Sequence, residues 1–578
     1  MCRRWRAYGE THCAGARYFG KVLMARDILI GIIEDALARA AAAGAVPEVE
    51  HGRIELDRPK RKEHGDWATN IALELASSTR MKPREVADAL VSFIEAPADV
   101  VSKVEVAGPG FINFHLSGRF IRAVLFEIAE KGPHFGKSDS GGGRKVQVEF
   151  VSANPVGPLH VGHGRWAALG DALANVMSHA GYRVEREFYI NDYGTQLQNF
   201  GRSISARYME LLGRDEDWPE GGYAGRYIVE IARSIFAGHS DEYVSLDVEE
   251  RTARFIDMEY PRILESIRRT LERMGVAFDV WFSERGLYER GEVASTLRGL
   301  EERGEAYRRQ GALWLRTTDF GDEKDRVLVR SSGEPTYFAS DTAYHRDKME
   351  RGFDLVINIW GADHHGYVGR VKAAMDAMGY GREHLEVILG QLVRLFRSGE
   401  PVTMSKRTGD IITLDELLDE VGPDAARYFL LERSSDSPLD FDIELAKKES
   451  PENPVFYVQY AHARICSILR FADESGYEPV TPRPEEVEML ASEPEMDLLR
   501  KLAELEEVVE FCAERRAPHR LTGYAEELAA LFHAFYRDCR VVGEEEALTR
   551  ARIFLVSGVR RVLETVLGLI GVSAPEEM

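Results

Sequence analysis

Two histidines and one lysine have the residue types and the spacing that chemistry on phosphate requires. His160 and His163 lie three residues apart at the start of a predicted helix, so their imidazoles share one face and can donate hydrogen bonds to the same polyphosphate. Backbone N–H groups at a helix start favour phosphate as well. Far along the chain, Lys406, at the end of residues 404–406, can add an ammonium that neutralises charge as pyrophosphate leaves. Together these groups predict transfer of an adenylyl group from ATP.

A strand and a tight turn must place the first of these segments. Residues 146–151 alternate like a strand, and the Pro- and Gly-rich residues 154–158 end it before a helical pattern begins. Gly162, between the histidines, leaves room for a flat ring to approach the backbone. Taken alone, a His-x-x-His segment is more often a surface pair or half a metal site, and Lys406 could belong to a solvated basic loop. The joint order of strand, turn, His-x-Gly-His and later Met-Ser-Lys favours the phosphate interpretation.

These two segments resemble the two signature segments of class I aminoacyl-tRNA synthetases. Residues 160–163 resemble the first and residues 403–407 the second, although Thr403 stands where the family usually has lysine and Arg407 where it usually has serine. Within the class, the chain resembles the arginyl-tRNA synthetases, from about Met24 to Met578. The stretches that carry this resemblance are residues 64–70, 108–114, 148–164, 360–365 and 457–464.

The resemblance implies a reaction, its substrates and its residues. It implies ATP-dependent attachment of L-arginine to tRNA(Arg) through an arginyl-adenylate, with AMP and pyrophosphate as the other products. Mg²⁺ is expected to arrive with ATP rather than to sit in a protein cage. The implied catalytic residues are His160, His163 and Lys406, and the implied nucleotide-binding residues are these three with Gly162, Asp363, Met404 and Ser405. Family members generally need bound tRNA before the first step.

Arginine selection requires carboxylates that face a planar guanidinium. Glu149 lies on the strand before the histidines, and Tyr337 and Asp341 share one helix face if Pro335 opens a helical turn. From the residues alone, Glu149 could equally be a surface residue of its strand and Asp341 a helix cap. The resemblance implies that arginine is bound by Glu149, Ser152, Asn154, Tyr337 and Asp341. Such a site could reject lysine and citrulline without an editing domain.

The pattern along the chain predicts a multidomain α/β protein. Residues 24–135 mix helical and strand patterns, which indicates a small α+β amino-terminal domain. Residues 138–143 have the composition of a flexible linker. Strands and helices then alternate through residues 144–435, which predicts a Rossmann-type parallel-sheet catalytic domain with a charged helical insertion at about 201–300. Residues 440–578 are helical throughout and predict an all-α helical bundle.

The resemblance also assigns a part of tRNA to each of these regions. The amino-terminal domain would contact the tRNA elbow, the insertion would help to receive the acceptor end, and the bundle would bind the anticodon. Tyr460, Tyr536 and Met578 match positions near anticodon bases, where aromatic faces could stack on splayed nucleotides. Aromatic residues at helical spacing also occur in ordinary cores, so this alternative stays open.

Composition limits the classes of protein and of partner. The chain has 578 residues, 44% of them hydrophobic, and no apolar run long enough to span a membrane. Its five cysteines form no Cys-x-x-Cys pair, so neither a disulfide framework nor a thiolate zinc site is expected, and the content fits a reducing cytoplasm. The formal charge of −22 argues against a polyanionic partner, so nucleic acid would have to meet local patches such as residues 59–62 or 515–520.

Several alternatives remain at this stage. Residues 363–365 are a tempting metal cluster, but no glutamate or cysteine stands at suitable spacing, and we expect no protein-held metal. The arginine-rich residues 1–23 suggest either an organelle transit peptide or an extension from a misassigned start, and we favour the extension. We expect a monomer. The rival functions are a small-molecule nucleotidylyltransferase, a cysteinyl-tRNA synthetase and a noncatalytic tRNA-binding paralogue; the last would be expected to lose Lys406 or the histidines.

Overall fold

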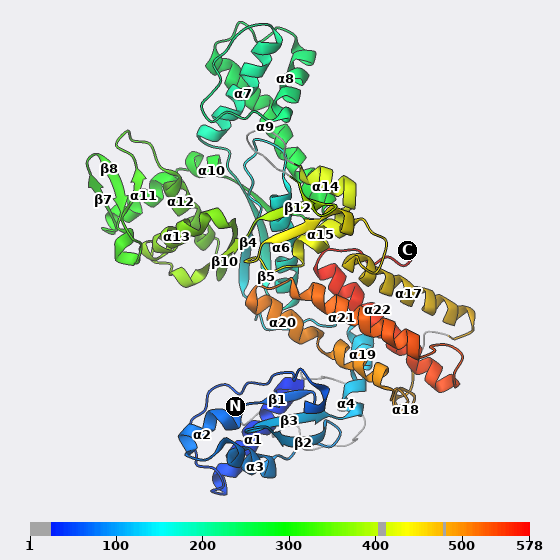
Figure 1. The fold of residues 1–578 in the computed structure, drawn as a ribbon. Coiled ribbons are helices and arrows are strands. Elements are labelled where there is room, and N and C mark those ends of the chain that lie inside the picture. Colours follow the sequence, from blue (N-terminus) through cyan, green and yellow to red (C-terminus); the bar gives the residue numbers. More distant parts are fainter. Residues whose placement is uncertain (1–24, 403–411, 478–480) are drawn as a thin grey trace.

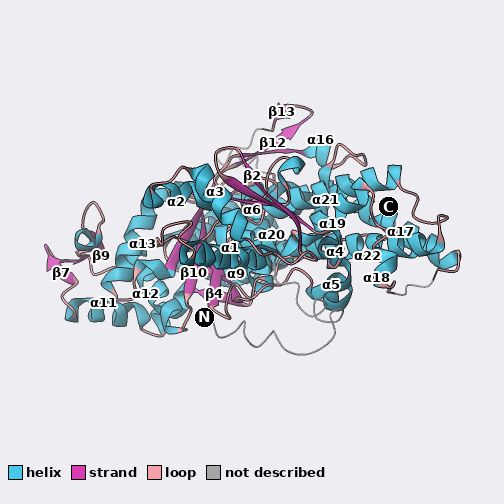
Figure 2. Cartoon of the chain, turned by 90° about the horizontal axis from the view of Figure 1, so that it is seen from below, coloured by secondary structure: helices cyan, strands magenta, loops and turns pink. Residues whose placement is uncertain are grey.

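The structure is a computed structural model that describes residues 25–402, 412–477 and 481–578. The central sheet lies in the middle of the molecule, a helical unit projects beyond it, and the carboxyl-terminal helices lie between it and the amino-terminal domain (Figure 1). Helices surround the strands of the central sheet (Figure 2). This arrangement confirms the predicted fold class of a parallel-sheet domain, a small α+β domain and an all-α bundle.

The amino-terminal domain is a three-stranded antiparallel sheet packed with three helices. Its elements are α1 (Ala25–Ala42), η2 (Lys62–His64), β1 (Trp67–Thr69), α2 (Ile71–Thr79), α3 (Pro83–Phe93), β2 (Val101–Ala107) and β3 (Phe111–Leu116), with the sheet order β1-β3-β2. Ile112 and Phe114 are fully buried on one face of β3, because alternate residues of a strand point the same way. They form a separate hydrophobic core with Leu29 and Ile33 of α1.

The next helices leave this domain and pack on the carboxyl-terminal bundle. They are α4 (Gly118–Arg122), α5 (Val124–Lys131) and η3 (Gly132–His134). Arg122 Nε donates to the carbonyl oxygen of Leu490 at 2.8 Å. Leu125 belongs to the hydrophobic core that the bundle shares with the central sheet, whereas Phe120 of α4 packs against the amino-terminal core. The range predicted for the amino-terminal domain, residues 24–135, therefore includes helices that also pack on the bundle.

The predicted linker at residues 138–143 is a loop bonded to the end of a helix. The N–H of Gly141 donates to the carbonyl of Ala180 at 2.7 Å, and the N–H of Gly143 donates to the carbonyl of Gly181 at 2.9 Å. These bonds satisfy backbone groups of both segments where they meet. The structure thus differs from the linker prediction, since composition alone does not reveal backbone pairing across distant segments.

The central sheet has five parallel strands in the order β11-β10-β4-β5-β6. Their bounds are β4 (Lys145–Glu149), β5 (Arg183–Ile190), β6 (Val280–Ser283), β10 (Leu355–Gly361) and β11 (Leu385–Gly390). The sequence pattern predicts strands at residues 146–151, 185–190, 355–359 and 386–389, which correspond to β4, β5, β10 and β11, whereas β6 was not predicted. In chain order the strands lie 3-2-1-4-5, the doubly wound order in which ligands bind where the order reverses, at the carboxyl ends of β4 and β10.

The helical unit interrupts the sheet between β5 and β6. It consists of α7 (Thr195–Leu211), α8 (Arg226–His239) and α9 (Val248–Arg273), and it forms its own hydrophobic core. Because β6 returns to the sheet beside β5, the insertion is shorter than the predicted residues 201–300. The chain continues through α10 (Glu284–Glu289), α11 (Glu292–Glu302), β7 (Ala306–Arg309), β8 (Ala312–Leu315), η4 (Thr317–Phe320), β9 (Arg326–Val329), α12 (Tyr337–Glu350), η5 (Ala362–His364), α13 (His365–Ala377) and η6 (Arg382–His384).

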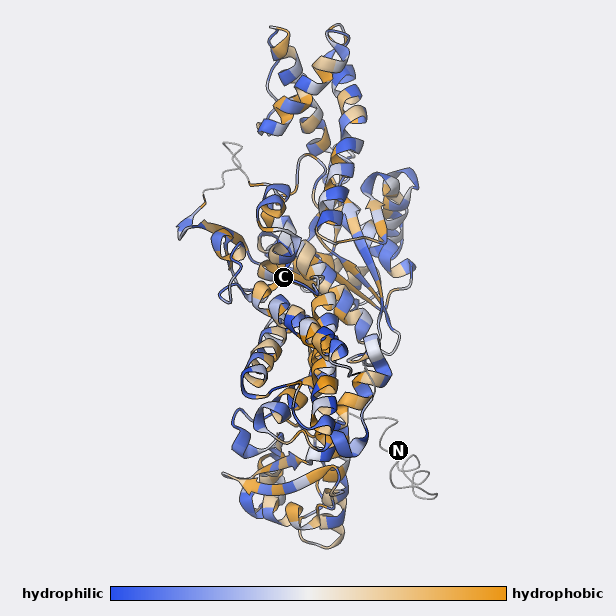
Figure 3. Cartoon of the chain, turned by 90° about the vertical axis from the view of Figure 1, so that its right-hand side faces the viewer, coloured by the Kyte–Doolittle hydropathy of each residue, from blue (hydrophilic) through white to orange (hydrophobic). Residues whose placement is uncertain are grey.

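A second small sheet joins the catalytic region to the bundle. Its order is β13-β12-β14, and its elements and neighbours are β12 (Val393–Arg397), β13 (Glu400–Pro401), α14 (Leu414–Val421), α15 (Pro423–Leu431), β14 (Leu439–Asp442) and α16 (Ile443–Ala446). The bundle consists of α17 (Pro454–Glu474), α18 (Pro484–Val487), α19 (Glu493–Ala503), α20 (Leu505–Arg515), α21 (Arg520–Asp538) and α22 (Glu546–Leu569). Hydrophobic residues gather along the central sheet and on the inner turns of these helices (Figure 3). No helix among the described residues is both long and apolar enough to cross a membrane.

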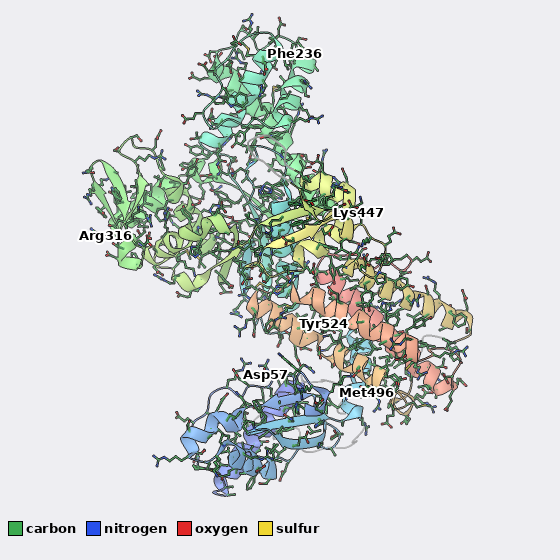
Figure 4. All side chains as sticks on the ribbon, viewed as in Figure 1. Asp57, Phe236, Arg316, Lys447, Met496 and Tyr524 are labelled. Carbon is green, nitrogen blue, oxygen red and sulfur yellow. The ribbon has the colours of Figure 1, made fainter. Side chains whose placement is uncertain are left out.

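A cleft of about 870 Å³ separates the amino-terminal domain from the bundle, and Asp57 and Tyr524 line it from opposite sides (Figure 4). Ion pairs span the junction, including Arg58 Nε to Glu507 Oε2 at 3.1 Å. Lys62 belongs to the basic patch predicted at residues 59–62. Its Nζ lies 2.6 Å from Asp497 Oδ2 of α19. This part of the predicted patch therefore contributes to packing between domains.

Candidate active site

The paired histidines lie where helix α6 (Val161–His179) begins, beyond the carboxyl end of β4 (Figure 1). His160 caps the helix, and its Nδ1 accepts from the N–H of Gly162 at 3.1 Å. The His163 Nδ1 accepts from the N–H of His160 at 3.2 Å, and the two rings stack with centroids 3.8 Å apart. Because both Nδ1 atoms accept, each neutral ring carries its proton on Nε2. The arrangement orients two ring donors together.

Gly162 is required by this stacking. A Cβ at this position would lie 2.9 Å from Cε1 of the His160 ring. Such contacts force a shift of one ring, because real side chains do not approach so closely. The flat ring that approaches the backbone at Gly162 in the structure is that of His160 itself.

The described residues that follow the Lys406 segment lie against the start of the histidine helix. Thr413 forms a backbone bridge with His160, and the N–H of Leu414 donates to the carbonyl of Leu159 at 2.8 Å. Met404, Ser405 and Lys406 themselves lie outside the described residues. Thr413 is seven positions after Lys406, and seven residues of extended chain reach at most about 25 Å. The described end of the segment is therefore held beside the start of α6.

Two acidic side chains on neighbouring elements, Asp341 of α12 and Glu284 of α10, lie close enough to interact electrostatically, and we call their surroundings the acidic pocket. Asp341 in α12 accepts a hydrogen bond from the hydroxyl of Tyr367. Desolvation, with the charge of Glu149 nearby, raises the pKa of Asp341 to about 6. Glu284 opens α10 after β6 and is 3% exposed. Desolvation raises its pKa to about 7, and the nearby Asp341 charge adds to that shift. A cation entering the pocket would favour ionisation of both carboxyl groups.

The other predicted arginine contacts differ in their surroundings. Tyr337 is 51% exposed in the first turn of α12, and Asn154 is exposed after β4. Glu149 is buried, and its Oε2 lies 2.5 Å from Lys348 Nζ. Its Oε1 accepts from Ser152 Oγ at 3.0 Å. The structure thus brings Glu149 and Ser152 together and engages both in protein hydrogen bonds, and Asp341 likewise accepts from Tyr367.

Glu284 was missed in the sequence because it falls within the range predicted as insertion. A signal was nevertheless present. Ser283 caps α10 by accepting from the N–H of Gly286 at 3.2 Å, which is the Ser-plus-acid pattern of a helix start. Had the short β6 been recognised as a strand, Glu284 would have followed its carboxyl end, where ligands bind in a parallel sheet.

Comparisons with known proteins agree with this geometry. Three family models match in succession: "Arginyl tRNA synthetase N terminal domain" at residues 27–116, "tRNA synthetases class I (R), catalytic domain" at residues 128–450, and "DALR anticodon binding domain" at residues 458–578. The arginine–tRNA ligase of Carboxydothermus hydrogenoformans is 53% identical over 553 residues, which cover 95% of this chain and 99% of that protein. The chain belongs to the arginyl-tRNA synthetase family.

Solved structures of arginyl-tRNA synthetases have the same fold. The protein from Thermus thermophilus superposes with a TM-score of 0.74 at 25% identity, over 95% of this chain and all of that one. A putative arginyl-tRNA synthetase from Campylobacter jejuni gives a TM-score of 0.72 at 36% identity, over 80% of this chain and all of that one. In this family member the paired histidines and the acidic pocket therefore lie in the class I catalytic domain.

Asp363 lies in a short turn after β10, on the other side of the point where the strand order reverses. It is exposed, and its Oδ2 lies 3.8 Å from His364 Nε2. Within residues 25–402, 412–477 and 481–578, no group of three His, Cys, Asp or Glu side chains is arranged to hold a metal ion. The position of Asp363 beside the switch point is compatible with contact to a nucleotide.

The three residues predicted to contact tRNA line one cleft of about 550 Å³ in the bundle. Tyr460 comes from α17, Tyr536 from α21, and Met578 is the last residue of the chain. Arg464 lies between the aromatic rings, with its guanidinium carbon 4.8 Å from the Tyr460 centroid and 5.0 Å from the Tyr536 centroid. Tyr536 is 40% exposed and Met578 is 55% exposed, so these side chains are not core residues.

Proposed function

We propose that this arginyl-tRNA synthetase family member attaches L-arginine to tRNA(Arg) with ATP, through an arginyl-adenylate. The observation that supports this most directly is the interaction between the carboxyl groups of Asp341 and Glu284, together with the effect on Asp341 of Glu149, which ends the strand that leads to the stacked histidines. Two carboxylates suit the planar, always charged guanidinium fork. ATP use follows from membership of the class I family.

In the first step, an oxygen of the arginine carboxylate attacks the α-phosphorus of ATP in line. The bond from that phosphorus to the bridging oxygen breaks, and pyrophosphate leaves. His160 and His163 donate hydrogen bonds to phosphate oxygens, and Lys406 neutralises the charge that builds on the leaving group. In the second step, the 2′-hydroxyl of the terminal tRNA adenosine attacks the arginyl carbonyl and releases AMP.

Nucleotide binding is assigned to residues around the start of α6 and the switch point. We assign contact with ATP to His160, Gly162, His163, Asp363, Met404, Ser405 and Lys406. Mg²⁺ would accompany ATP through its phosphates, since such ions usually keep their waters and substrate ligands. Because the catalytic groups supply two ring N–H donors and one ammonium, their main action is positioning and charge stabilisation.

Arginine binding is assigned to the acidic pocket. Asp341 and Glu284 take the guanidinium, and the exposed Tyr337 and Asn154 border the entrance. Glu149 and Ser152 shape the pocket from the end of β4, since their side-chain hydrogen bonds go to protein groups.

The Michaelis constant for arginine is expected to rise as the pH falls through 7. The pKa values of Glu284 and Asp341, about 7 and about 6, mean that protonation removes first one and then the other negative charge. Arginine favours the ionised acids, so binding near pH 7 should also release protons. Steady-state kinetics from about pH 6 to about pH 8.5 and calorimetry in two buffers measure both effects. Glu284→Gln should remove the upper inflection; an arginine Michaelis constant that is flat over this range would contradict the assignment.

Recognition of tRNA is assigned to three regions. The amino-terminal domain contacts the elbow, the helical unit α7 to α9 helps to receive the acceptor end, and the cleft of Tyr460, Tyr536 and Met578 takes anticodon bases. The cleft supports this assignment because exposed aromatic faces and an arginine suit stacked, unpaired nucleotides.

Tyr536→Ala is expected to weaken tRNA binding by about 1 to 3 kcal/mol, roughly 5- to 150-fold, through lost stacking on a base. The Michaelis constant for tRNA should rise while that for arginine stays constant. Tyr307→Ala is a matched control, because the Tyr307 ring of β7 also lies near an arginine, 4.7 Å from the guanidinium carbon of Arg316, outside this cleft and outside the regions assigned to tRNA. Equal effects of the two substitutions would remove Tyr536 from the tRNA site.

The proposed function is tested by ATP-dependent charging of tRNA with each labelled amino acid. We expect charging with arginine alone, pyrophosphate exchange only when tRNA is present, and loss of both in Lys406→Ala. Charging with another amino acid would show that the pocket assignment is wrong. Binding of tRNA without any charging would instead support the noncatalytic paralogue.

We further propose that the active species is a monomer and that it acts in the cytoplasm, as the cysteine content suggested. Sedimentation of the purified protein tests the first statement. Residues 1–23, assigned as an extension before the family's usual start, lie outside the described residues.

A further inference from the structure

One buried ammonium lies close to the acids proposed to bind arginine. Lys348, in the last turn of α12, is 0% exposed, and its Nζ lies 2.5 Å from Glu149 Oε2. The same Nζ donates to Asn358 Oδ1 at 2.9 Å. It also lies 4.2 Å from the centroid of the Tyr344 ring. A lysine ammonium has three donors, so this group is fully satisfied inside the protein.

The hydrogen bonds continue from Lys348 to the pocket. Asn358 Nδ2 donates to His345 Nε2 at 2.9 Å, and His345 Nδ1 donates to the carbonyl of Asp341 at 2.7 Å. Desolvation lowers the pKa of His345 to about 3, so the ring is neutral and its single N–H is the donor to Asp341. Lys348 is thereby connected to the turn of α12 that carries a proposed guanidinium ligand.

The charges of Lys348 and of the nearby carboxyl groups determine what Lys348 can contribute to arginine binding. Glu149 and Lys348 act electrostatically on Asp341, and Asp341 acts on Glu284. Three carboxylates without a buried cation would repel one another, and some would take up protons. With Glu149 paired, two carboxylates remain for one guanidinium.

We propose that Lys348 is a positioning residue for arginine selection, which cancels the charge of Glu149 and so leaves Asp341 and Glu284 ionisable for the guanidinium. This inference rests on the proposed function. Lys348 does not touch the substrate; it acts through Glu149 and the Asn358–His345 pair. A buried ion pair by itself is weak evidence for a role in stability, so its placement close to these acids is the informative fact.

The test compares the pH dependence of the arginine Michaelis constant in four proteins. The groups that act on the two acids are Tyr367, Glu149 and Lys348 at Asp341, and Ser340, Tyr189, Asp341 and Asp192 at Glu284. The Michaelis constant for arginine has an inflection at the pH where the acids lose their charge. In Lys348→Met, the unpaired Glu149 charge should raise the pH of this inflection by about half a unit or more. In Glu149→Gln, the unpaired ammonium should lower it. In the double variant the inflection should return to the wild-type position.

Lys448→Met is the matched control, because Lys448 Nζ also lies 2.5 Å from a carboxylate, Glu452, but on the surface. It should leave the inflection and the arginine Michaelis constant unchanged. Active-site titration corrects for misfolded protein, and the Michaelis constant for ATP should change less than about threefold in every variant.

Opposite shifts in the single variants and their cancellation in the double variant would establish the inference. If Lys348→Met fails to fold, Glu149→Gln and the double variant still measure the shift. Unshifted inflections with only a lower melting temperature would overturn it and leave an ordinary structural ion pair. A wild-type protein that charges no arginine would overturn the proposed function instead, which is a separate outcome.

Discussion

Asp341→Asn is expected to lower kcat/KM for arginine by about 2 to 5 kcal/mol, roughly 30- to 5,000-fold, because it removes one partner of a desolvated charge pair. The remaining acid, Glu284, would then face the guanidinium alone, and the amide introduced by the substitution would present donors to a group that has only donors. Steady-state charging at saturating ATP and tRNA measures the loss. Most of it should lie in the arginine Michaelis constant, since the reacting phosphorus is held by other residues.

Asp347→Asn is the control for this prediction, because Asp347 lies on the same helix but pairs with Arg351 at 2.9 Å. Its effect should be confined to stability. An Asp341→Asn protein that folds and charges arginine as well as the wild type would show that the guanidinium lies elsewhere. Loss of activity with ATP and arginine affinity intact would place Asp341 in the chemical step rather than in binding.

The elements that place the histidines were predictable because their patterns are local. The alternation of β4 and the Pro- and Gly-rich turn before α6 are written in consecutive residues, and the structure confirms both. The strand β6 was missed because four residues that are all only partly buried carry no alternation. Because β6 was missed, Glu284 was missed as well, and it is the acid that the structure adds to the predicted pocket.

Patterns of neighbouring residues could not predict which distant residues pair with each other. Lys348 stands in a charged stretch that resembles a solvated helix face, yet its partner Glu149 is 199 residues away in the chain. The same limitation explains the amino-terminal boundary. Helices α4 and α5 fall in the range predicted for the amino-terminal domain, but they pack on α19 and α22 of the bundle. Periodicity shows that a helix has an apolar face, and tertiary packing decides which partner buries it.

A second buried charge shows how far such pairings hold the molecule together. Arg427 of α15 is 1% exposed, and its guanidinium contacts three distant segments. It lies 2.5 Å from Asp171 of α6, donates to the carbonyl of Met274 after α9 at 2.9 Å, and donates to the carbonyl of Ile570 after α22 at 2.9 Å. One side chain therefore joins the catalytic sheet, the helical unit and the bundle.

Arg427→Met is expected to lower the free energy of unfolding by about 3 kcal/mol or more, because it leaves Asp171 and two backbone carbonyls without this partner in a desolvated place. Chemical denaturation followed by fluorescence measures the change, with Arg394→Met as the control. Arg394 Nε lies 2.6 Å from Asp440 on the surface, where such a pair contributes about 0 to 1 kcal/mol. Asp171→Asn combined with Arg427→Met should be less destabilised than Arg427→Met alone, since no unpaired charge remains. Equal losses in the Arg427 and Arg394 variants would mean that the contacts of Arg427 do not hold the three segments together.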